Sequence, residues 1–371
     1  MNKQDIYKLE EFCNFKYGKM PERSKISEDN SLYPIYSGYK IVGYYEDWNI
    51  EKGSLLVVAR GVGGTGDVKL SPAKCYLTNL SISIEVDNNI ALNEFLYYYW
   101  KIRNLRYLDS GSAQSQITIN DLKKVEVNLP SIDVQKEIVS ILKAFDDKID
   151  NNKKINHHLE EMINTLYLMF IESGEQLETK KLDELFDTKT ATFNPAKTNE
   201  KKVNHFSLPA FDTNQYPSVD DINNIKSNKN VVKEYSVLFS KLNPATKRVW
   251  VPFTNQDLLS VCSTEFISLA GKDKFEQAIL FAIINSQSFQ DYFIAHATGT
   301  TNSRQRTKPS VAYEFEIPYN EVLFKQLGIS LSPLVTQLED NLHQIQKLTQ
   351  IRYELLPKLL SGKISVNQTT K

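Results

Sequence analysis

The chain has 371 residues, 41% of them hydrophobic, which is enough for two globular domains rather than one. Its formal net charge is −1, so the total charge gives no sign of a nucleic-acid partner, although acidic segments can mask a local basic patch. Three widely spaced cysteines, Cys13, Cys75 and Cys262, argue against a disulfide framework or a structural zinc site. The N-terminus lacks an apolar signal core, and no stretch of about 18 apolar residues occurs, so we expect a soluble, cytoplasmic protein.

The N-terminal part of the chain, up to Pro130, has the pattern of a β-rich module. Runs rich in β-branched residues predict strands at 55–60, 76–86 and 125–130. A helix is expected at 93–108, ahead of a small polar loop that begins at Gly111.

A long helix is predicted after Pro130, with Ser131 or Asp133 as its N-cap and its end near Ile171. About 38 helical residues would span roughly 57 Å. Apolar residues at steps of three and four mark one stripe of this helix, as in a coiled coil. The stripe consists of Ile138, Leu142, Phe145, Ile149, Leu159, Met162, Leu166 and Phe170.

The second half of the chain has the same layout. Strands are predicted within 231–242, 247–253, 258–270 and 313–318, and a helix at 275–295. A second long helix follows, and its stripe matches the first position by position, with Asn341 falling on Asn152. A buried Asn in such a seam fixes the register of the pair. The stripe consists of Leu331, Leu334, Leu338, Leu348, Ile351, Leu355 and Leu359.

Further matches extend the repeat to the β-rich modules. Pro318 matches Pro130, and the pairs Gly111–Gly299 and Ser115–Ser303 keep the same spacing. We therefore predict an α+β fold in which two β-rich modules alternate with two long helices, paired as an antiparallel coiled coil about a pseudo-two-fold axis. The expected domains are 1–130, 131–174 (central helix), 175–319 and 320–371 (C-terminal helix and tail).

Two unlike modules joined by a helix pair would suit a bipartite DNA target, with the helices setting a separation greater than one DNA turn of about 34 Å. Five stretches carry a more specific resemblance: residues 33–47, 53–66, 79–84, 130–155 and 355–364, the last reading LLPKLLSGKI. Through them, nearly the whole chain resembles the specificity subunits of Type I restriction–modification systems.

The resemblance implies that each module binds the major groove of double-stranded DNA at one half-site. It further implies two methylation subunits that flank the helices and restriction subunits that join through them. S-adenosylmethionine, ATP and Mg²⁺ would be bound by those partners, and this chain would hold no catalytic site, cofactor or metal.

The loop before the last strand of each module supplies the best candidates for DNA contact. Glutamine and asparagine suit adenine, arginine suits guanine or phosphate, and hydroxyl groups suit either bases or phosphates. We expect no acidic residue near the second loop. The candidates are Ser112, Gln114, Ser115 and Gln116 in the first loop, and Thr300, Thr301, Asn302, Ser303, Arg304, Gln305, Arg306 and Lys308 in the second.

Other basic residues are expected to contact the DNA backbone, where they would make the affinity depend on salt. In the first module these are Lys16, Lys19, Arg23, Lys40 and Arg60; in the second they are Lys189, Lys197, Lys241, Lys247 and Arg248.

Four alternatives compete with this interpretation. The GxGxxG motif at Gly61–Gly66 would suit a dinucleotide-binding enzyme, but the Pro72 region after it does not read as the helix that such a site needs. Asn243-Pro-Ala-Thr is only a fragment of an adenine-methyltransferase motif. A specificity subunit of a fused restriction–methyltransferase, or a coiled-coil scaffold without DNA binding, would share the same architecture.

Overall fold

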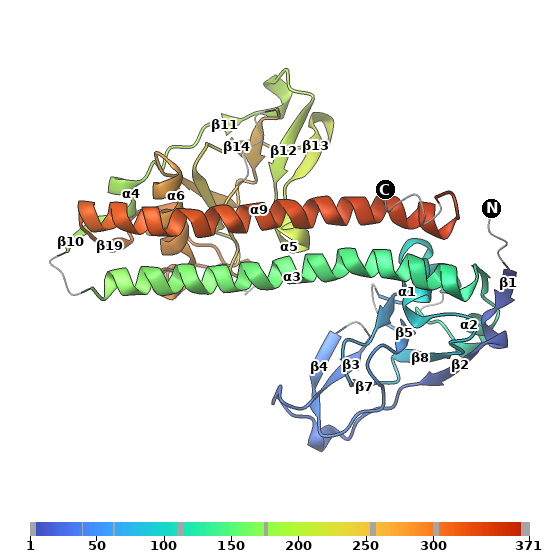
Figure 1. Cartoon of the computed structure of the whole chain (residues 1–371). Coiled ribbons are helices and arrows are strands. Elements are labelled where there is room, and N and C mark those ends of the chain that lie inside the picture. The colour runs from blue at the N-terminus through green and yellow to red at the C-terminus, as the bar shows by residue number, and fades with distance from the viewer. Residues whose placement is uncertain are drawn as a thin grey trace. The chain divides into compact units, whose positions relative to one another are not determined.

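The computed structural model describes residues 5–38, 40–61, 64–109, 115–173, 177–252, 257–299 and 304–364. It divides into two compact units, shown within Figure 1. Unit 1 comprises Met1–Asp147 and Gln350–Lys371, and unit 2 comprises Lys148–Thr349. Two helices of 40 residues each, α3 (Ile132–Ile171) and α9 (Glu321–Leu360), contribute to both units. No helix among the described residues is long and apolar enough to cross a membrane.

Among its described residues, unit 1 has three small sheets and two short α-helices besides the segments of α3 and α9. Strand β5 lies inside the largest sheet and is buried throughout, which explains its unbroken apolar sequence LLVV. The core of unit 1 joins Phe95 and Trp100 of α1 to Leu142 of α3 and Leu359 of α9. The sheets are β2 (Cys13–Tyr17)–β8 (Ser81–Val86)–β5 (Leu55–Val58)–β6 (Val68–Leu70), β4 (Lys40–Tyr45)–β3 (Tyr33–Ser37)–β7 (Tyr76–Leu77) and β1 (Asp5–Lys8)–β9 (Glu126–Leu129); the helices are α1 (Asn93–Arg103) and α2 (Ile119–Lys123).

Unit 2 repeats this plan with a larger sheet and more helices. The fully buried strands β15 and β18 pair in antiparallel register and pack against α6 and α7. The sheets are β11 (Thr192–Phe193)–β14 (Lys229–Val231)–β17 (Ser260–Cys262)–β12 (Lys202–Phe206)–β13 (Ser218–Asp221), β16 (Val249–Trp250)–β15 (Ser236–Ser240)–β18 (Phe266–Ala270) and β10 (Glu178–Lys181)–β19 (Glu316–Tyr319); the helices are α4 (Leu182–Leu185), α5 (Leu208–Asn214), α6 (Lys274–Asn285), α7 (Gln287–Ala295) and α8 (Pro309–Tyr313).

The helix predicted at 275–295 is two helices, because Ser286 interrupts it. Ser286 has extended dihedral angles (φ −67°, ψ 150°), and its hydroxyl oxygen accepts a hydrogen bond from the backbone N–H of Phe289 at 3.3 Å. It therefore ends α6 and caps α7, a role that serine favours over an interior helical position.

The internal repeat is visible in the backbone pairing, but the spacing between its copies differs from the one predicted. Leu129 of β9 pairs with the first residue of β1, just as Tyr319 of β19 pairs with the first residue of β10. With Leu129 and Tyr319 equivalent, the counterpart of Pro130 is Asn320, so the spacing taken from the prolines is wrong. Pro318 instead lies inside β19, which pairs on one side only and can therefore accept a proline, whereas Pro130 follows β9.

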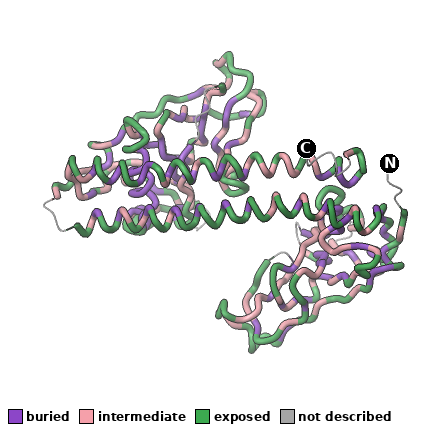
Figure 2. Tube along the Cα trace, in the orientation of Figure 1, coloured by how far each residue is buried: buried purple, intermediate pink, exposed green. Residues whose placement is uncertain are grey.

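The two long helices run antiparallel. In unit 2 the Asn152 amide donates to Gln344 Oε1 at 3.2 Å, and the Asn341 amide donates to Asn156 Oδ1 at 2.8 Å. Rising numbers on α3 thus meet falling numbers on α9, which confirms the predicted fold class. Asn152 and Asn341 are both buried, at 1% and 3% exposure. Figure 2 shows buried and exposed segments alternating along each helix, as one apolar face requires.

One residue assigned to the apolar stripe of α3 lies elsewhere. Met162 is 51% exposed, whereas Ile163 and Tyr167 are buried in the seam between Leu159 and Phe170. From Leu159 to Phe170 the buried residues follow one another at steps of four, four and three. The predicted stripe had steps of three, four and four over the same segment. Both sets are apolar, so the pattern alone did not separate them.

Candidate nucleic-acid interface

The same backbone contact joins two loops in each unit. In unit 1, Arg60 forms an isolated antiparallel bridge with Gln116, and the Ile117 N–H donates to the Ala59 carbonyl at 2.9 Å. In unit 2, Leu242 and Arg306 form the corresponding bridge, and the Thr307 N–H donates to the Lys241 carbonyl at 3.1 Å. The segment after the buried strand, β5 or β15, is thereby fixed to the loop before α2 or α8. We call these contacts the unit 1 bridge (Arg60–Gln116) and the unit 2 bridge (Leu242–Arg306).

A carboxylate organises the loop beside the unit 1 bridge. Asp109 accepts a hydrogen bond from the Ser115 hydroxyl at 2.5 Å and another from the Gln116 N–H at 3.1 Å. Thr118 then caps α2 in a reciprocal pair with Asp121, and these hydrogen bonds lower the pKa of the Asp121 carboxyl. The Ser115 hydroxyl is therefore used within the protein, and Gln116 extends from a fixed backbone. The candidates Ser112 and Gln114 lie outside the described residues.

The hairpin of β3 and β4 brings Lys40 close to the unit 1 bridge. Gly38 has a left-handed conformation (φ 61°), and a Cβ atom built on it would lie 3.6 Å from the Arg60 carbonyl oxygen. Lys40 is exposed just beyond this turn. Thus three segments that are distant in sequence, those of Gly38, Arg60 and Gln116, meet in unit 1, and Lys40 is exposed two residues after Gly38.

The remaining basic candidates of unit 1 are exposed but belong to other segments. Lys16 on β2 forms a 3.5 Å ion pair with Glu85 on β8, and both side chains are largely exposed. Lys19 follows β2, where its N–H donates to the Leu77 carbonyl, and Arg23 begins a 3-10 turn. The described contacts do not connect them to the unit 1 bridge.

The glycine-rich motif of unit 1 does not lead into a helix. Strand β6 begins at Val68, two residues after Gly66 ends the motif, so the motif leads into a strand and not into a helix N-terminus that could receive a pyrophosphate. Gly66 has φ 88°, and a Cβ atom there would lie 2.6 Å from the Arg106 backbone nitrogen. This glycine is required by close packing of two backbone segments rather than by a nucleotide.

The unit 2 bridge carries an arginine that is already paired. The guanidinium of Arg306 donates to both carboxylate oxygens of Glu265, each at 3.1 Å, and this pairing raises the pKa of Arg306. The expectation that no acid lies near this loop is therefore wrong, because Glu265 comes from the turn before β18, far earlier in the chain. The Arg306 side chain nevertheless keeps 50% of its surface exposed.

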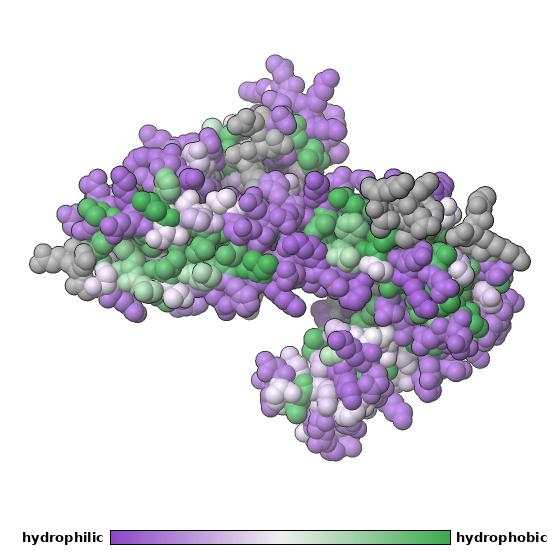
Figure 3. Space-filling model, viewed as in Figure 1, coloured by the Kyte–Doolittle hydropathy of each residue, from purple (hydrophilic) through white to green (hydrophobic). Residues whose placement is uncertain are grey.

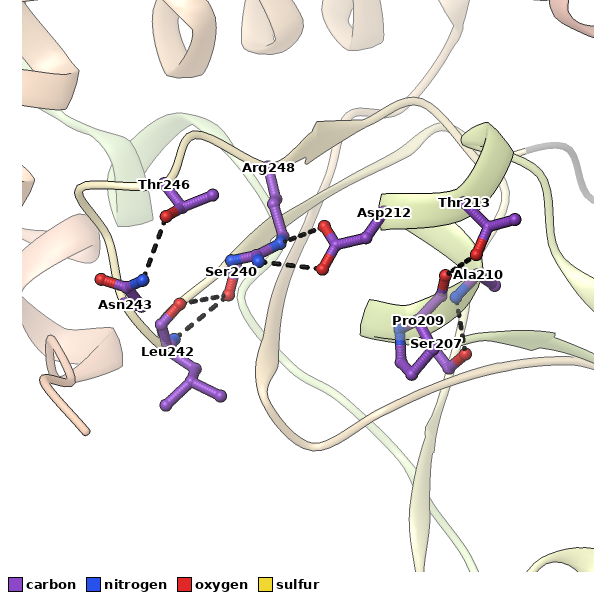
Figure 4. A network of polar contacts seen from close by, with 10 residues as sticks. All are labelled: Ser207, Pro209, Ala210, Asp212, Thr213, Ser240, Leu242, Asn243, Thr246 and Arg248. Atoms are coloured by element: carbon purple, nitrogen blue, oxygen red, sulfur yellow. Dashed lines mark hydrogen bonds and ion pairs between the residues drawn. The ribbon is translucent and has the colours of Figure 1, made fainter. Parts of the chain in front are cut away.

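The loop after β15 is held by a network of side chains, shown in Figure 4. Arg248 donates to both oxygens of Asp212 on α5, at 2.6 and 2.9 Å, and is only 14% exposed. Asn243 adopts a left-handed conformation (φ 50°), and its amide donates to Thr246 Oγ1 at 3.0 Å. Asn243 is thus a turn residue, and Arg248 is a structural clamp.

The comparisons with known proteins agree on one family. Residues 1–161 match the model of the Type I restriction modification DNA specificity domain. The Type I restriction enzyme MjaIX specificity subunit of Methanocaldococcus jannaschii is 24% identical over 356 residues, covering 85% of this chain and 79% of that protein. Residues 1–161 thus carry a domain of this family, and the chain as a whole is similar to Type I specificity subunits.

A shorter sequence match and a shared fold accompany this resemblance. The putative MjaX specificity subunit of the same organism is 31% identical over 97 residues, 26% of this chain and 23% of that protein. The crystal structure of the S subunit of a Type I restriction-modification system from M. genitalium shares the fold, with a TM-score of 0.65, 18% identity and 96% coverage of both chains. The predicted family resemblance is confirmed.

The other candidate DNA-binding residues of unit 2 differ in how far they are exposed. Arg304, Lys308, Lys189 and Lys197 are exposed, and Gln305 is half-buried, with its carbonyl accepting from the Asn243 N–H at 2.8 Å. Lys241 is half-buried beside the bridge, and the ammonium of Lys247 donates to the Asn285 carbonyl at 2.9 Å. The candidates at 300–303, namely Thr300, Thr301, Asn302 and Ser303, lie outside the described residues.

Sequence reasoning missed the acidic partners of these surfaces. Asp109, Asp212 and Glu265 each hold a candidate DNA-binding residue, and the last two are far from it in the sequence. Only the tertiary fold brings Asp212 and Glu265 to their partners, so a local search along the sequence gave no signal for them.

Proposed function

We propose that this chain selects the DNA target of a Type I restriction–modification complex, with each module reading one half of a bipartite, asymmetric site. The observation that carries the proposal is the repeated bridge, which presents a loop and the end of a buried strand together in both units. The family match of residues 1–161 supports DNA as the partner.

The two surfaces differ in the groups they offer, and this difference supports two unlike half-sites. The unit 1 surface offers Lys40, Arg60 and Gln116, whereas unit 2 offers Arg304 with the paired Arg306. Arginine can donate two hydrogen bonds to guanine, and glutamine can pair with adenine through both of its amide groups. Each surface would therefore favour different bases.

The proposal assigns the helix pair two tasks: setting the gap between the half-sites and docking the methylation subunits. Exposed apolar residues recur every seven positions on α3, at Ile155, Met162 and Met169. Figure 3 shows hydrophobic side chains along the helix pair in unit 2. A stripe of this kind on a helix that already buries its other face suits a second protein.

The partner subunits would then carry out the catalysed reactions. The methylation subunits would bind S-adenosylmethionine, and the restriction subunits, joined through them, would use ATP and Mg²⁺. The role of this chain would be binding and positioning alone.

Co-expression with the cognate methylation subunit, followed by mapping of methylated adenines across a genome, tests the proposal. A bipartite motif with a fixed gap is expected. Methylation without any motif, or no methylation with a methylation subunit that is active beside another specificity subunit, would contradict it.

A further inference from the structure

Asp109 makes two hydrogen bonds beside the unit 1 bridge, and one of them has a counterpart in unit 2. Its carboxylate accepts from the Gln116 N–H at 3.1 Å. Arg306 occupies the place of Gln116 in the unit 2 bridge, and its N–H donates to the backbone carbonyl of Thr298 at 2.9 Å. The repeated frame therefore needs an acceptor for this N–H, and a backbone carbonyl serves as well as a carboxylate.

The second hydrogen bond of Asp109 is particular to unit 1. The Ser115 hydroxyl donates to the other carboxylate oxygen of Asp109 at 2.5 Å. The residue before Arg306 in unit 2 is Gln305, which has no hydroxyl group. The bond between Asp109 and Ser115 thus lies outside the frame that the two units share, and holding that frame together does not explain it.

This bond fixes the direction of the Ser115 hydroxyl hydrogen. An ionised carboxylate can only accept, so the hydrogen points at Asp109 and the Ser115 oxygen keeps only its lone pairs for a ligand. Ser115 is half-buried, and its hydroxyl makes no other hydrogen bond among the described residues. It is therefore an acceptor, next to the bridge that joins Arg60 and Gln116.

An acceptor of this kind suits a base edge and does not suit the DNA backbone. Phosphate oxygens carry no hydrogen to donate, and the negative charge of Asp109 would repel them. In the major groove the available donors are the amino groups of adenine and cytosine. The pair of Asp109 and Ser115 thus has the polarity that reads one of these two bases.

We propose that the Ser115 hydroxyl oxygen accepts a hydrogen bond from the amino group of an adenine or cytosine in the half-site read by the first module. Asp109 is the positioning residue that makes this hydroxyl an acceptor without touching the base. This inference rests on the proposed function, because it names one group that the first module reads.

The experiment uses the whole chain assembled with its methylation subunits and a duplex that carries the mapped motif. Every adenine and cytosine except the methylated adenines is replaced in turn by purine or 2-pyrimidinone, which lack the amino group. At the contacted position this replacement should weaken wild-type binding about three- to tenfold, the net effect of one hydrogen bond.

Two variants should abolish this sensitivity by different routes. Ser115→Ala removes the acceptor, so it should bind the replaced and unreplaced duplexes equally at that position. In Asp109→Asn the amide oxygen can still accept from the Gln116 N–H, while the amide nitrogen donates to Ser115 and releases the hydroxyl hydrogen. The double variant should show no further loss, because both residues act through one hydrogen bond.

Asp121→Asn is the matched control, because it alters the same kind of pair in the same unit. Asp121 accepts from the hydroxyl and the N–H of Thr118, at 2.6 and 2.9 Å, where they cap α2. The control should lower the thermal stability of the chain but keep the wild-type ratio of affinities between the two duplexes. An equal loss of that ratio in Asp121→Asn would reduce the role of Asp109 to general stability.

The inference fails if no amino-group replacement weakens wild-type binding, or if Ser115→Ala keeps the wild-type sensitivity at every position. Sensitivity that is lost in Gln116→Ala instead would assign the amino group to Gln116. The positioning role fails if Asp109→Asn keeps the sensitivity that Ser115→Ala loses. In each of these cases the bipartite motif would remain, whereas failure of the proposed function would abolish the motif itself.

Discussion

The unit 1 and unit 2 bridges share a backbone arrangement but treat their arginines in opposite ways. Arg60 makes no ion pair among the described residues, while Arg306 and Arg248 are each held by both oxygens of a carboxylate, Glu265 and Asp212. A clamped guanidinium has a fixed direction and a neighbouring negative charge that offsets its own, whereas an open one can adapt to phosphate or base. The two copies of one frame thus hold their arginines differently, and the following changes test whether this difference affects DNA binding.

The largest effect is expected from Arg60→Ala. Loss of a guanidinium contact with guanine or phosphate should cost about 1–3 kcal/mol of DNA binding free energy. Thermal stability should stay close to wild type because the residue is exposed. Titration of a motif duplex by the assembled complex measures this, with Lys136→Ala on α3 as the charge-matched control. Equal losses of DNA affinity in Arg60→Ala and Lys136→Ala would contradict a specific role for Arg60.

The long helices also differ between the two units, in how each holds a carboxyl group. In unit 1, Asp146 accepts hydrogen bonds from Tyr98 and Arg352, whereas in unit 2 burial and the neighbouring Asp340 raise the pKa of Glu339 to about 7. Because folding raises this pKa from 4.5, the stabilising contribution of the protonated group is complete below pH 4.5 and is lost as the pH rises to about 7.

Glu339→Gln should therefore stabilise unit 2 at pH 8 by about 1–3 kcal/mol, and the gain should shrink as the pH falls towards 4.5. Thermal unfolding across this pH range provides the measurement, with the exposed Glu354→Gln as control. A gain that does not depend on pH would show that Glu339 is ionised in the folded chain.

A smaller loss of stability should follow Asp212→Asn. The Arg248 guanidinium would keep its low exposure of 14% but lose its carboxylate, at a cost of about 1–2 kcal/mol. The exposed pair of Lys16 and Glu85 is the comparison, since Glu85→Gln should change stability by less than about 0.5 kcal/mol. Denaturant unfolding of both variants measures the difference, and equal effects would contradict the clamp assigned to Asp212.

The smallest effect is expected from Glu265→Gln, which would release Arg306 for DNA. Affinity for duplexes without the motif should rise a few-fold, and the slope of log affinity against log salt should steepen by about one, the contribution of one phosphate contact. An unchanged slope would mean that Arg306 stays away from the DNA backbone even when it is not paired.

The long helices and the repeat could be predicted because they depend on patterns spread over many residues. The predicted start after Pro130 and end near Ile171 agree with the observed Ile132–Ile171. The phase of the seam at Met162 could not be predicted, since Ile163 and Tyr167 offered an equally apolar alternative. The ion pairs that hold Arg306 and Arg248 could not be predicted either, because only the tertiary fold brings their carboxylates close.

The central claim is that two unlike modules each read half of one target. Methylated adenines mapped for the wild type, Arg60→Ala and Arg304→Ala, each assembled with the cognate methylation subunit, test it most directly. We predict a bipartite motif with a fixed gap for the wild type, relaxed in one half by Arg60→Ala and in the other half by Arg304→Ala. A continuous motif, or relaxation of the same half by both variants, would contradict the account.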